Sequence, residues 1–181
     1  MVYKRVILKR GKEESLKRFH PWVFSGAIAR MDNIEEGDLV TVYDHEGNLI
    51  GNGHYQIGSI AVRILTFDDT EIDSAFFVKR LTEAFKMRQA LGLSRPDNNA
   101  FRLVHGEGDF LPGLVVDIYG STAVMQAHSP GMHFARNLIA DALTRLPNGV
   151  VKNVYYKSET PLPYKAQLDP QNEYIVGEYD T

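Results

Sequence analysis

One segment in the middle of the chain combines turn signals with the pattern of a buried strand: Arg102-Leu-Val-His-Gly-Glu-Gly-Asp-Phe-Leu-Pro-Gly-Leu-Val-Val-Asp-Ile-Tyr-Gly120. Its inner glycines can adopt positive φ angles that side chains resist, and Pro112 favours an extended conformation in the residue before it. Leu114 to Tyr119 then form a short apolar run, and Thr122 to Ala127 form a second. The pair predicts a β-hairpin over residues 113–128.

The composition is that of a folded protein. The 181 residues are 44% hydrophobic, which is enough for one large core or two small ones. The absence of cysteine excludes disulfides, thiolate metal sites and a cysteine nucleophile, and it fits a reducing compartment. Because the chain has neither a signal-like N-terminus nor an apolar run of about 18 residues, we expect a soluble, cytoplasmic protein without membrane contact.

The charge is distributed unevenly along the chain. Eight Lys or Arg and two Glu give residues 1–30 a net charge of +6, so the remainder carries −9 within a total of −3. A basic end beside an acidic body would steer a polyanion to one face. The alternative is a solvated basic surface with no partner, and charge alone does not separate the two.

The first part of the chain has the pattern of several short strands. An edge strand is expected over residues 2–8, a loop over 21–26, and further strands over 39–43, from residue 49 onward, and over 60–65. Gly51 and Gly53 interrupt the fourth of these segments, which predicts a bulge or a close backbone approach. Short strands with turns at this spacing indicate a small barrel or sandwich.

The second part mixes helices and strands. A linking helix is expected over residues 73–92, capped by Asp73 and ended by Gly92, and a second helix over 130–146, begun by Ser129 and Pro130. Weak strands are expected over residues 150–156 and 174–179. The order strand, strand, helix, strand, strand indicates an α+β domain over residues 73–181, which follows an N-terminal domain over residues 1–72. Gly113 should need a positive φ, and its hairpin should pack under the second helix.

Three motifs, in order, resemble a known family. They are His20-Pro-Trp-Val-Phe-Ser-Gly26, Gly51-Asn-Gly-His-Tyr55 with Ile60-Ala-Val-Arg-Ile64, and a central series of Arg102, Gly106, Glu107, Asp109, Leu111 to Leu114, Asp117 and Tyr119. The chain resembles the PUA-domain-containing, S-adenosylmethionine-dependent 23S rRNA cytosine-C5 methyltransferases over nearly its whole length. The resemblance implies that the first domain is a PUA-like β-pseudobarrel.

The same resemblance implies a division of labour. The family's catalytic domain, which binds S-adenosylmethionine, would begin after residue 181, so no catalytic or cofactor-binding residue is expected here. The two domains would bind structured RNA, namely 23S rRNA, and orient it. The alternative function is a freestanding PUA-type RNA-binding module without methyltransferase activity. A homodimer is left open.

The candidate RNA-binding residues combine cations, aromatic rings and a hydroxyl, the groups that bind phosphate and stack on bases. They are Lys17, Arg18, His20, Trp22, Phe24, Ser25, Gly53, His54 and Tyr55. For Trp22 and Phe24 the structural alternative is a plug at the end of the barrel. For Gly53 it is a bulge that only closes the barrel.

The carboxylates of the central segment are expected to be structural. Asp109 should cap a turn and Glu107 should pair with Arg102, in preference to a hydrolytic pair. The six histidines show no zinc-ligand spacing, and the carboxylates are too sparse for a calcium loop, so no metal site is expected. Gly106-x-Gly108 lacks the third glycine and the following helix of a dinucleotide loop.

Overall fold

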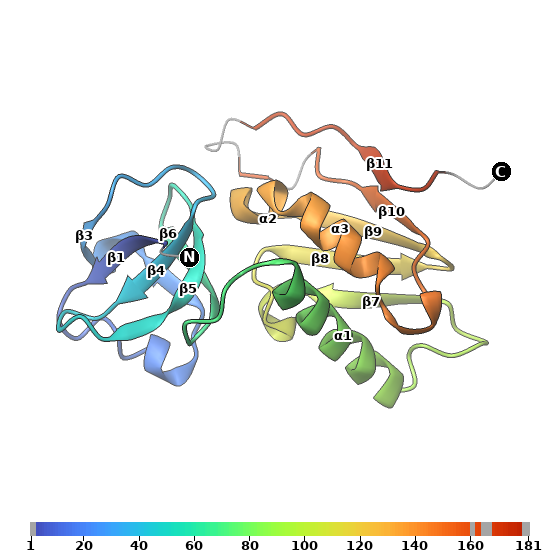
Figure 1. Ribbon diagram of the computed structural model, residues 1–181, viewed down its shortest axis with the longest axis horizontal. Helices are drawn as coiled ribbons and strands as arrows, with labels where there is room; N and C mark the ends of the chain where they lie inside the picture. Colours follow the sequence, from blue (N-terminus) through green and yellow to red (C-terminus); the bar gives the residue numbers. More distant parts are fainter. Residues whose placement is uncertain (1–2, 160–161, 164–167, 179–181) are drawn as a thin grey trace.

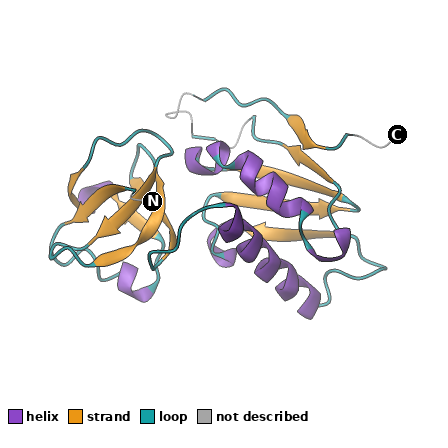
Figure 2. Ribbon diagram, viewed as in Figure 1, coloured by secondary structure: helices purple, strands orange, loops and turns teal. Residues whose placement is uncertain are grey.

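The computed structural model describes residues 3–159, 162–163 and 168–178. It contains two β-sheets that lie beside each other along the long axis of the molecule (Figure 1). Among the described residues all α-helices belong to the second unit, while the first is built of strands, loops and short 3₁₀ turns (Figure 2). The α+β class expected from the sequence is confirmed.

The first sheet is curled into a half-barrel of six strands in the order β2-β6-β5-β4-β1-β3. The strands are β1 (Lys4–Leu8), β2 (Trp22–Phe24), β3 (Ile28–Met31), β4 (Leu39–Tyr43), β5 (Leu49–Tyr55) and β6 (Ile60–Thr66). Most neighbours are antiparallel, and β1 pairs with β4 in parallel. The buried faces of β1, β4 and β6 supply most of the core of this unit.

Two strands of this sheet were not expected. Residues 21–26 were predicted as a loop, but Trp22–Phe24 form the edge strand β2, which pairs with β6. Ile28–Met31 form β3 at the opposite edge. Both strands are short and bury few side chains, so their sequences lack the alternation that marks a longer strand.

The expected close approach at Gly51 and Gly53 is present. A Cβ on Gly51 would lie 2.1 Å from the carbonyl oxygen of Thr66, and one on Gly53 would lie 2.1 Å from that of Arg63. The ladder between β5 and β6 also shifts register between Asn52 and Gly53. The glycines therefore let β6 cross β5 closely and curl the sheet.

The linking helix α1 (Ser74–Ala90) follows the first sheet. Its N-cap is Asp73, whose carboxylate accepts a 2.9 Å hydrogen bond from the backbone N–H of Phe76, as expected. Gly92 follows the last turn with φ +69°. The helix buries one apolar face against the second unit, formed by Phe76, Phe77, Leu81, Ala84 and Phe85.

The second sheet has five strands in the order β11-β10-β9-β8-β7. They are β7 (Ala100–His105), β8 (Leu114–Tyr119), β9 (Thr122–Ala127), β10 (Asn153–Tyr156) and β11 (Glu173–Val176). The predicted hairpin is confirmed: β8 and β9 are antiparallel and join through Gly120, which has φ +59°. Strand β7 was not expected, and its adjacent buried Leu103 and Val104 break the alternation of a typical strand. Of the last expected strand, residue 179 lies outside the described residues.

The second expected helix is interrupted. It forms α2 (Pro130–Phe134) and α3 (Arg136–Thr144), with the break at Ala135. The side chain of Arg136 donates a 3.0 Å hydrogen bond to the carbonyl of His133, the group that would otherwise accept the next helical bond. Ser129 caps α2 as expected, since its hydroxyl accepts from the N–H of Met132. Figure 1 shows α1 and α3 side by side over one face of the sheet.

The larger core lies between these helices and the sheet. The strand residues Leu114, Val116 and Ile118 are fully buried under α3, as expected for the hairpin. Leu65 and Ile72, from the end of the first unit and the linker, also belong to this core. The predicted boundary at residues 72 and 73 therefore falls in a segment that is packed against the second unit.

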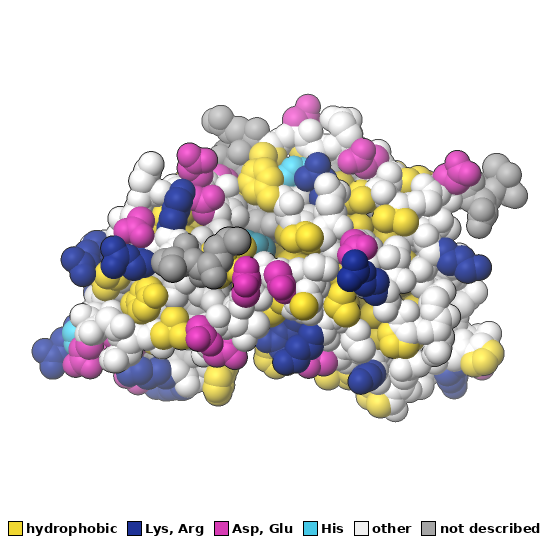
Figure 3. Space-filling model, in the orientation of Figure 1, with side chains coloured by type: hydrophobic (Ala, Val, Ile, Leu, Met, Phe, Trp, Pro, Cys, Tyr) yellow, Lys and Arg dark blue, Asp and Glu magenta, His cyan; other side chains and the backbone are white. Residues whose placement is uncertain are grey.

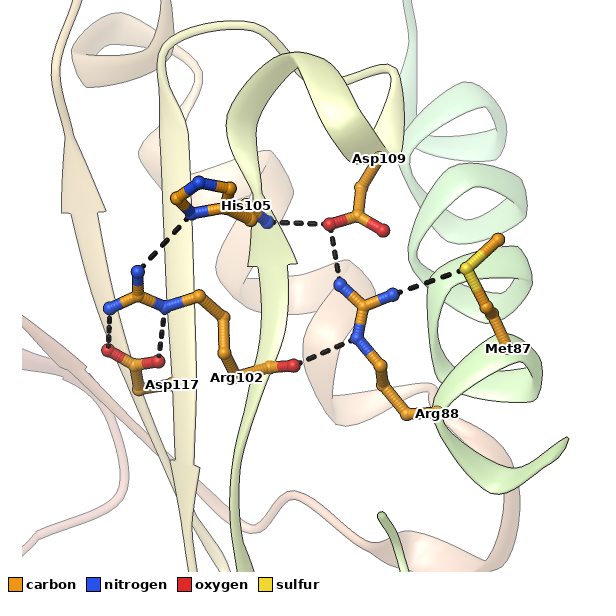
Figure 4. Close-up of polar contacts among 6 residues, drawn as sticks. All are labelled: Met87, Arg88, Arg102, His105, Asp109 and Asp117. Atoms are coloured by element: carbon orange, nitrogen blue, oxygen red, sulfur yellow. Dashed lines mark hydrogen bonds and ion pairs between the residues drawn. The ribbon is translucent and has the colours of Figure 1, made fainter. Parts of the chain in front are cut away.

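The central motif is held by two ion pairs of different burial (Figure 4). Arg88 of α1 donates at 2.7 Å to Asp109 and at 2.9 Å to the carbonyl of Arg102, and Asp109 also accepts from the N–H of His105 at 2.6 Å. Asp109 thus caps the 3₁₀ turn η3 (Gly106–Asp109), as expected. The expected pairing of Glu107 with Arg102 is wrong, because Arg102 forms a bidentate pair with Asp117 at 2.8 and 3.0 Å.

Candidate nucleic-acid interface

Three aromatic side chains form a row along the edge strand β2. The rings of His20 and Trp22 meet edge to face with centroids 5.4 Å apart, and Trp22 meets Phe24 in the same way at 6.4 Å. Trp22 is half-buried, while Phe24 is 49% exposed. Because successive side chains of a strand alternate between faces, residues 22 and 24 share one face of the sheet edge. The row can stack on unpaired bases.

Two of the expected cations lie on a short turn that precedes this row in the chain. Lys17 and Arg18 belong to the 3₁₀ turn η1 (Leu16–Arg18), which is anchored by the buried side chain of Leu16. Lys17 lies 3.8 Å from Glu13, and both cations are exposed. A groove of about 350 Å³ separates η1 from β2; its lining includes Leu16, Trp22 and Phe24. The exposed Ser25 follows β2 directly. Lys12 is the cation in the lining of this groove, whereas Lys17 lines a separate hollow with Phe19, Asp44 and Glu46.

The remaining candidates lie away from this surface. Gly53 is buried in the tight ladder between β5 and β6. His54 is 5% exposed, and burial together with the nearby charge of Arg63 lowers its pKa to about 4. Tyr55 is half-buried against the barrel core. His54 packs directly on Gly131 of α2, so it connects the two units and has no open face for RNA.

Two residues of this region were not among the expected RNA-binding residues. Glu107 reaches across from η3 and accepts a 2.8 Å hydrogen bond from the indole Nε1 of Trp22. Phe19 is 69% exposed, adopts φ +63°, and packs edge-on against Phe67. Its position directly after Lys17 and Arg18 was the available signal, since exposed aromatic side chains beside cations are typical of RNA-binding surfaces.

The electrostatics of the surface are mixed. On the face drawn in Figure 3, Lys and Arg side chains over the barrel are interspersed with Asp and Glu side chains. Within the described ranges, no cluster of His, Asp and Glu could hold a metal ion. None of the helices described has the length and apolar character needed to cross a membrane.

Comparison with known proteins identifies the first unit as the PUA-like domain that the sequence resemblance implied. Residues 6–67 match the family described as PUA-like domain. The chain is 38% identical over 181 residues to the ribosomal RNA large subunit methyltransferase I of Klebsiella pneumoniae, and 37% identical over 177 residues to that of Escherichia coli. These matches cover 98% and 96% of the chain, but 44% of each relative. The chain therefore spans less than half the length of the curated relatives it matches.

Two solved structures share the fold. One is assigned as a SAM-dependent methyltransferase from Streptococcus mutans, with a TM-score of 0.78, 16% identity, and coverage of 100% of this chain and 44% of that one. The other is assigned as a methyltransferase complexed with SAH, with a TM-score of 0.77, 16% identity, and coverage of 99% and 44%. At this identity the likeness establishes the arrangement of both units and nothing about their ligands.

Proposed function

We propose that this chain is the RNA-binding and substrate-orienting N-terminal part of an S-adenosylmethionine-dependent rRNA cytosine-C5 methyltransferase of the cytoplasm, and that its partner is 23S rRNA. The observation that carries the proposal is the groove between η1 and β2, where Lys12 lies beside the rings of Trp22 and Phe24 inside the region that matches PUA-like domains; the exposed Lys17 and Arg18 lie on η1 itself. The names of the similar proteins, which are large-subunit rRNA methyltransferases, support the same substrate.

Each candidate residue has a separate task in this proposal. Lys17 and Arg18 neutralise phosphates, and Ser25 supplies a neutral hydrogen bond to the backbone. His20, Trp22 and Phe24 offer ring faces and edges to unpaired bases. His54 and Gly53 act indirectly, because they hold the barrel in shape and against the second unit. Residues outside this chain would bind the methyl donor and supply the catalytic groups.

The test is a binding titration with a structured fragment of large-subunit rRNA at low and high salt. Replacing Lys17 and Arg18 together by alanine should weaken binding and reduce its salt dependence, because each lost phosphate contact lowers the number of released counterions by about one. The matched control replaces the exposed Lys86 and Lys152, which lie on the second unit and change the net charge equally. Equal losses in both double variants, or affinity that is independent of salt, would contradict the proposed surface.

A further inference from the structure

A second hollow lies between the two units, next to the aromatic row. This cleft has a volume of about 400 Å³. It is lined by Arg63 of β6 on one side and by residues of β7, η3, β8 and the segment after β9 on the other; these are His105, Gly106, Glu107, Gly108, Gly113, Leu114, Val115 and His128. Clefts between domains with a few converging polar groups are preferred positions for ligands.

Arg63 is the first unusual feature of the cleft. Its side chain is half-buried, yet among the described residues it makes no ion pair and donates only to the side-chain oxygen of Gln56. Burial lowers the pKa of the guanidinium, and the charge of Glu107 offsets this in part. A half-buried charge without a counter-charge is unfavourable, and the N–H groups of Arg63 that do not bond to Gln56 are free for an acceptor that enters the cleft.

Glu107 is the second unusual feature. Its Oε1 accepts from Trp22, and no hydrogen bond to Oε2 exists within the described part of the chain. The carboxylate is thereby held in place while one oxygen stays available. Gly106 and Gly108 on either side carry no side chain, and a Cβ on Gly108 would meet nothing within 4 Å. The wall around the carboxylate is therefore open to a flat ligand.

The charge balance distinguishes a nucleobase from a phosphate. Burial and the charge of Arg102 lower the pKa of His128, and the charge of Glu107 offsets this in part, so the neutral imidazole is favoured. Arg63 and Glu107 then contribute one positive and one negative charge. A phosphate would be attracted by Arg63 and repelled by Glu107. A neutral ring with donors on one edge and acceptors on another can form hydrogen bonds to both side chains.

Guanine has this arrangement of groups. Its N1–H and N2–H donors lie side by side and match a carboxylate, while O6 and N7 are adjacent acceptors that match a guanidinium. We propose that the cleft binds one unpaired guanine of the RNA, with Glu107 accepting from N1–H and N2–H and Arg63 donating to O6 and N7. The inference rests on the proposed function, because the guanine is carried by the RNA that the barrel surface binds.

The experiment compares short single-stranded RNAs on the intact 181-residue chain. Labelled oligouridine, the same strand with one central guanosine, and the same strand with one central adenosine are titrated by fluorescence anisotropy. The guanosine should raise affinity about tenfold over oligouridine, and adenosine should not. The readout is the guanosine ratio, defined as the Kd for oligouridine divided by the Kd for the strand with one guanosine. This ratio separates base recognition in the cleft from phosphate binding on the barrel.

Two variants and one control locate the recognition. Glu107→Gln keeps an acceptor for Trp22 but presents an N–H group where the carboxylate oxygen was, and Arg63→Lys keeps the charge but loses the planar fork. Both should reduce the guanosine ratio to about one, while Glu178→Gln, at an exposed position, keeps it about tenfold. Thermal melts show whether each variant is folded. If Arg63→Lys proves unfolded, the result for Glu107→Gln decides the test.

The possible outcomes distinguish failure of the guanine site from failure of the proposed RNA-binding function. If the wild-type chain binds all three RNAs equally, or if Glu107→Gln keeps the preference for the guanosine strand, the guanine site is overturned. The proposed RNA-binding surface on the barrel is not affected by either result. A chain that binds none of the RNAs, including the structured rRNA fragment, overturns the proposed function and the site together. GMP that competes as well as the guanosine strand would show that the base is not recognised as part of RNA, and would also overturn the inference.

Discussion

The indole Nε1 of Trp22 donates a 2.8 Å hydrogen bond to Oε1 of Glu107, and this bond joins the edge strand of the barrel to the central motif of the second unit. The residues are 85 positions apart in sequence. The bond links the aromatic row to the wall of the cleft, so the two proposed RNA contacts share one fixed point. RNA that stacks on the row would reach the cleft without crossing a flexible joint.

The first prediction concerns the strength of this link. Trp22→Phe and Glu107→Ala each remove one partner, and their combined effect on the free energy of unfolding should be smaller than the sum of the single effects by about 1 kcal/mol. Urea unfolding of the four proteins in a double-mutant cycle measures this coupling. Strictly additive effects would mean that the bond contributes nothing to holding the units together.

The second prediction concerns Gly113, which has φ +85°. A Cβ there would lie 2.5 Å from the hydroxyl of Ser129, the N-cap of α2, so Gly113→Ala combines backbone strain with a clash. We expect a loss of roughly 2 to 3 kcal/mol in the free energy of unfolding. Gly120→Ala is the matched control, because Gly120 has φ +59° but open space around its Cβ position; it should lose only about 1 kcal/mol. Equal losses would show that the contact with Ser129 is easily relieved.

Local signals predicted well where backbone chemistry is specific. The Asp73 and Ser129 caps, the positive φ of Gly113 and the Gly120 turn all follow from rules that hold within a few residues. Strand β7 was missed because its burial depends on α1, which the chain places before it and folds back over it. The local sequence pattern of β7 does not indicate that α1 packs on it.

The site shows the same division between local and distant information. The aromatic and basic candidate residues of the barrel surface are close in sequence, so their composition pointed to a surface. Glu107 and Arg63 lie 44 positions apart and line the same cleft only because the two units pack together. His54 lies in a motif beside candidate contacts, yet the structure buries it against Gly131. Sequence could not supply either relationship.

The third prediction compares the two ion pairs of the central motif. The side chains of Arg88 and Asp109 are 11% and 3% exposed, whereas that of Arg102 is 48% exposed. Arg88→Met should lower the free energy of unfolding by about 3 to 5 kcal/mol, because it leaves a buried carboxylate without its counter-charge. Arg102→Met should lower it by no more than about 1 kcal/mol, since water screens the pair with Asp117. Chemical denaturation of both variants is the measurement, and a larger effect at Arg102 would reverse the assigned burial.

The fourth prediction concerns the contact between His54 and Gly131. A Cβ on Gly131 would lie 2.1 Å from Cγ of the buried imidazole. Alanine is preferred over glycine inside a helix by roughly 1 kcal/mol, but here the clash should dominate and Gly131→Ala should lower the melting temperature. The additional change His54→Ala makes room for the methyl group and should recover part of the loss. No recovery in the double variant would mean that the clash is with another group.

The last prediction is the pH dependence that His54 imposes. Its pKa is lowered from 6.5 to about 4, chiefly by burial, so between these pH values the unfolded chain binds a proton that the folded chain does not. The stability that comes from the neutral imidazole is fully present above pH 6.5 and is lost as the pH falls toward 4. Between pH 7 and pH 5 we expect the free energy of unfolding to fall by roughly 2 kcal/mol from this residue. His128 and His133, whose pKa values burial also lowers, add to the slope in the same direction, so the informative measurement is the difference between wild type and His54→Asn in urea unfolding at both pH values. Parallel slopes in the two proteins would show that folding does not lower the pKa of His54, and would contradict the prediction.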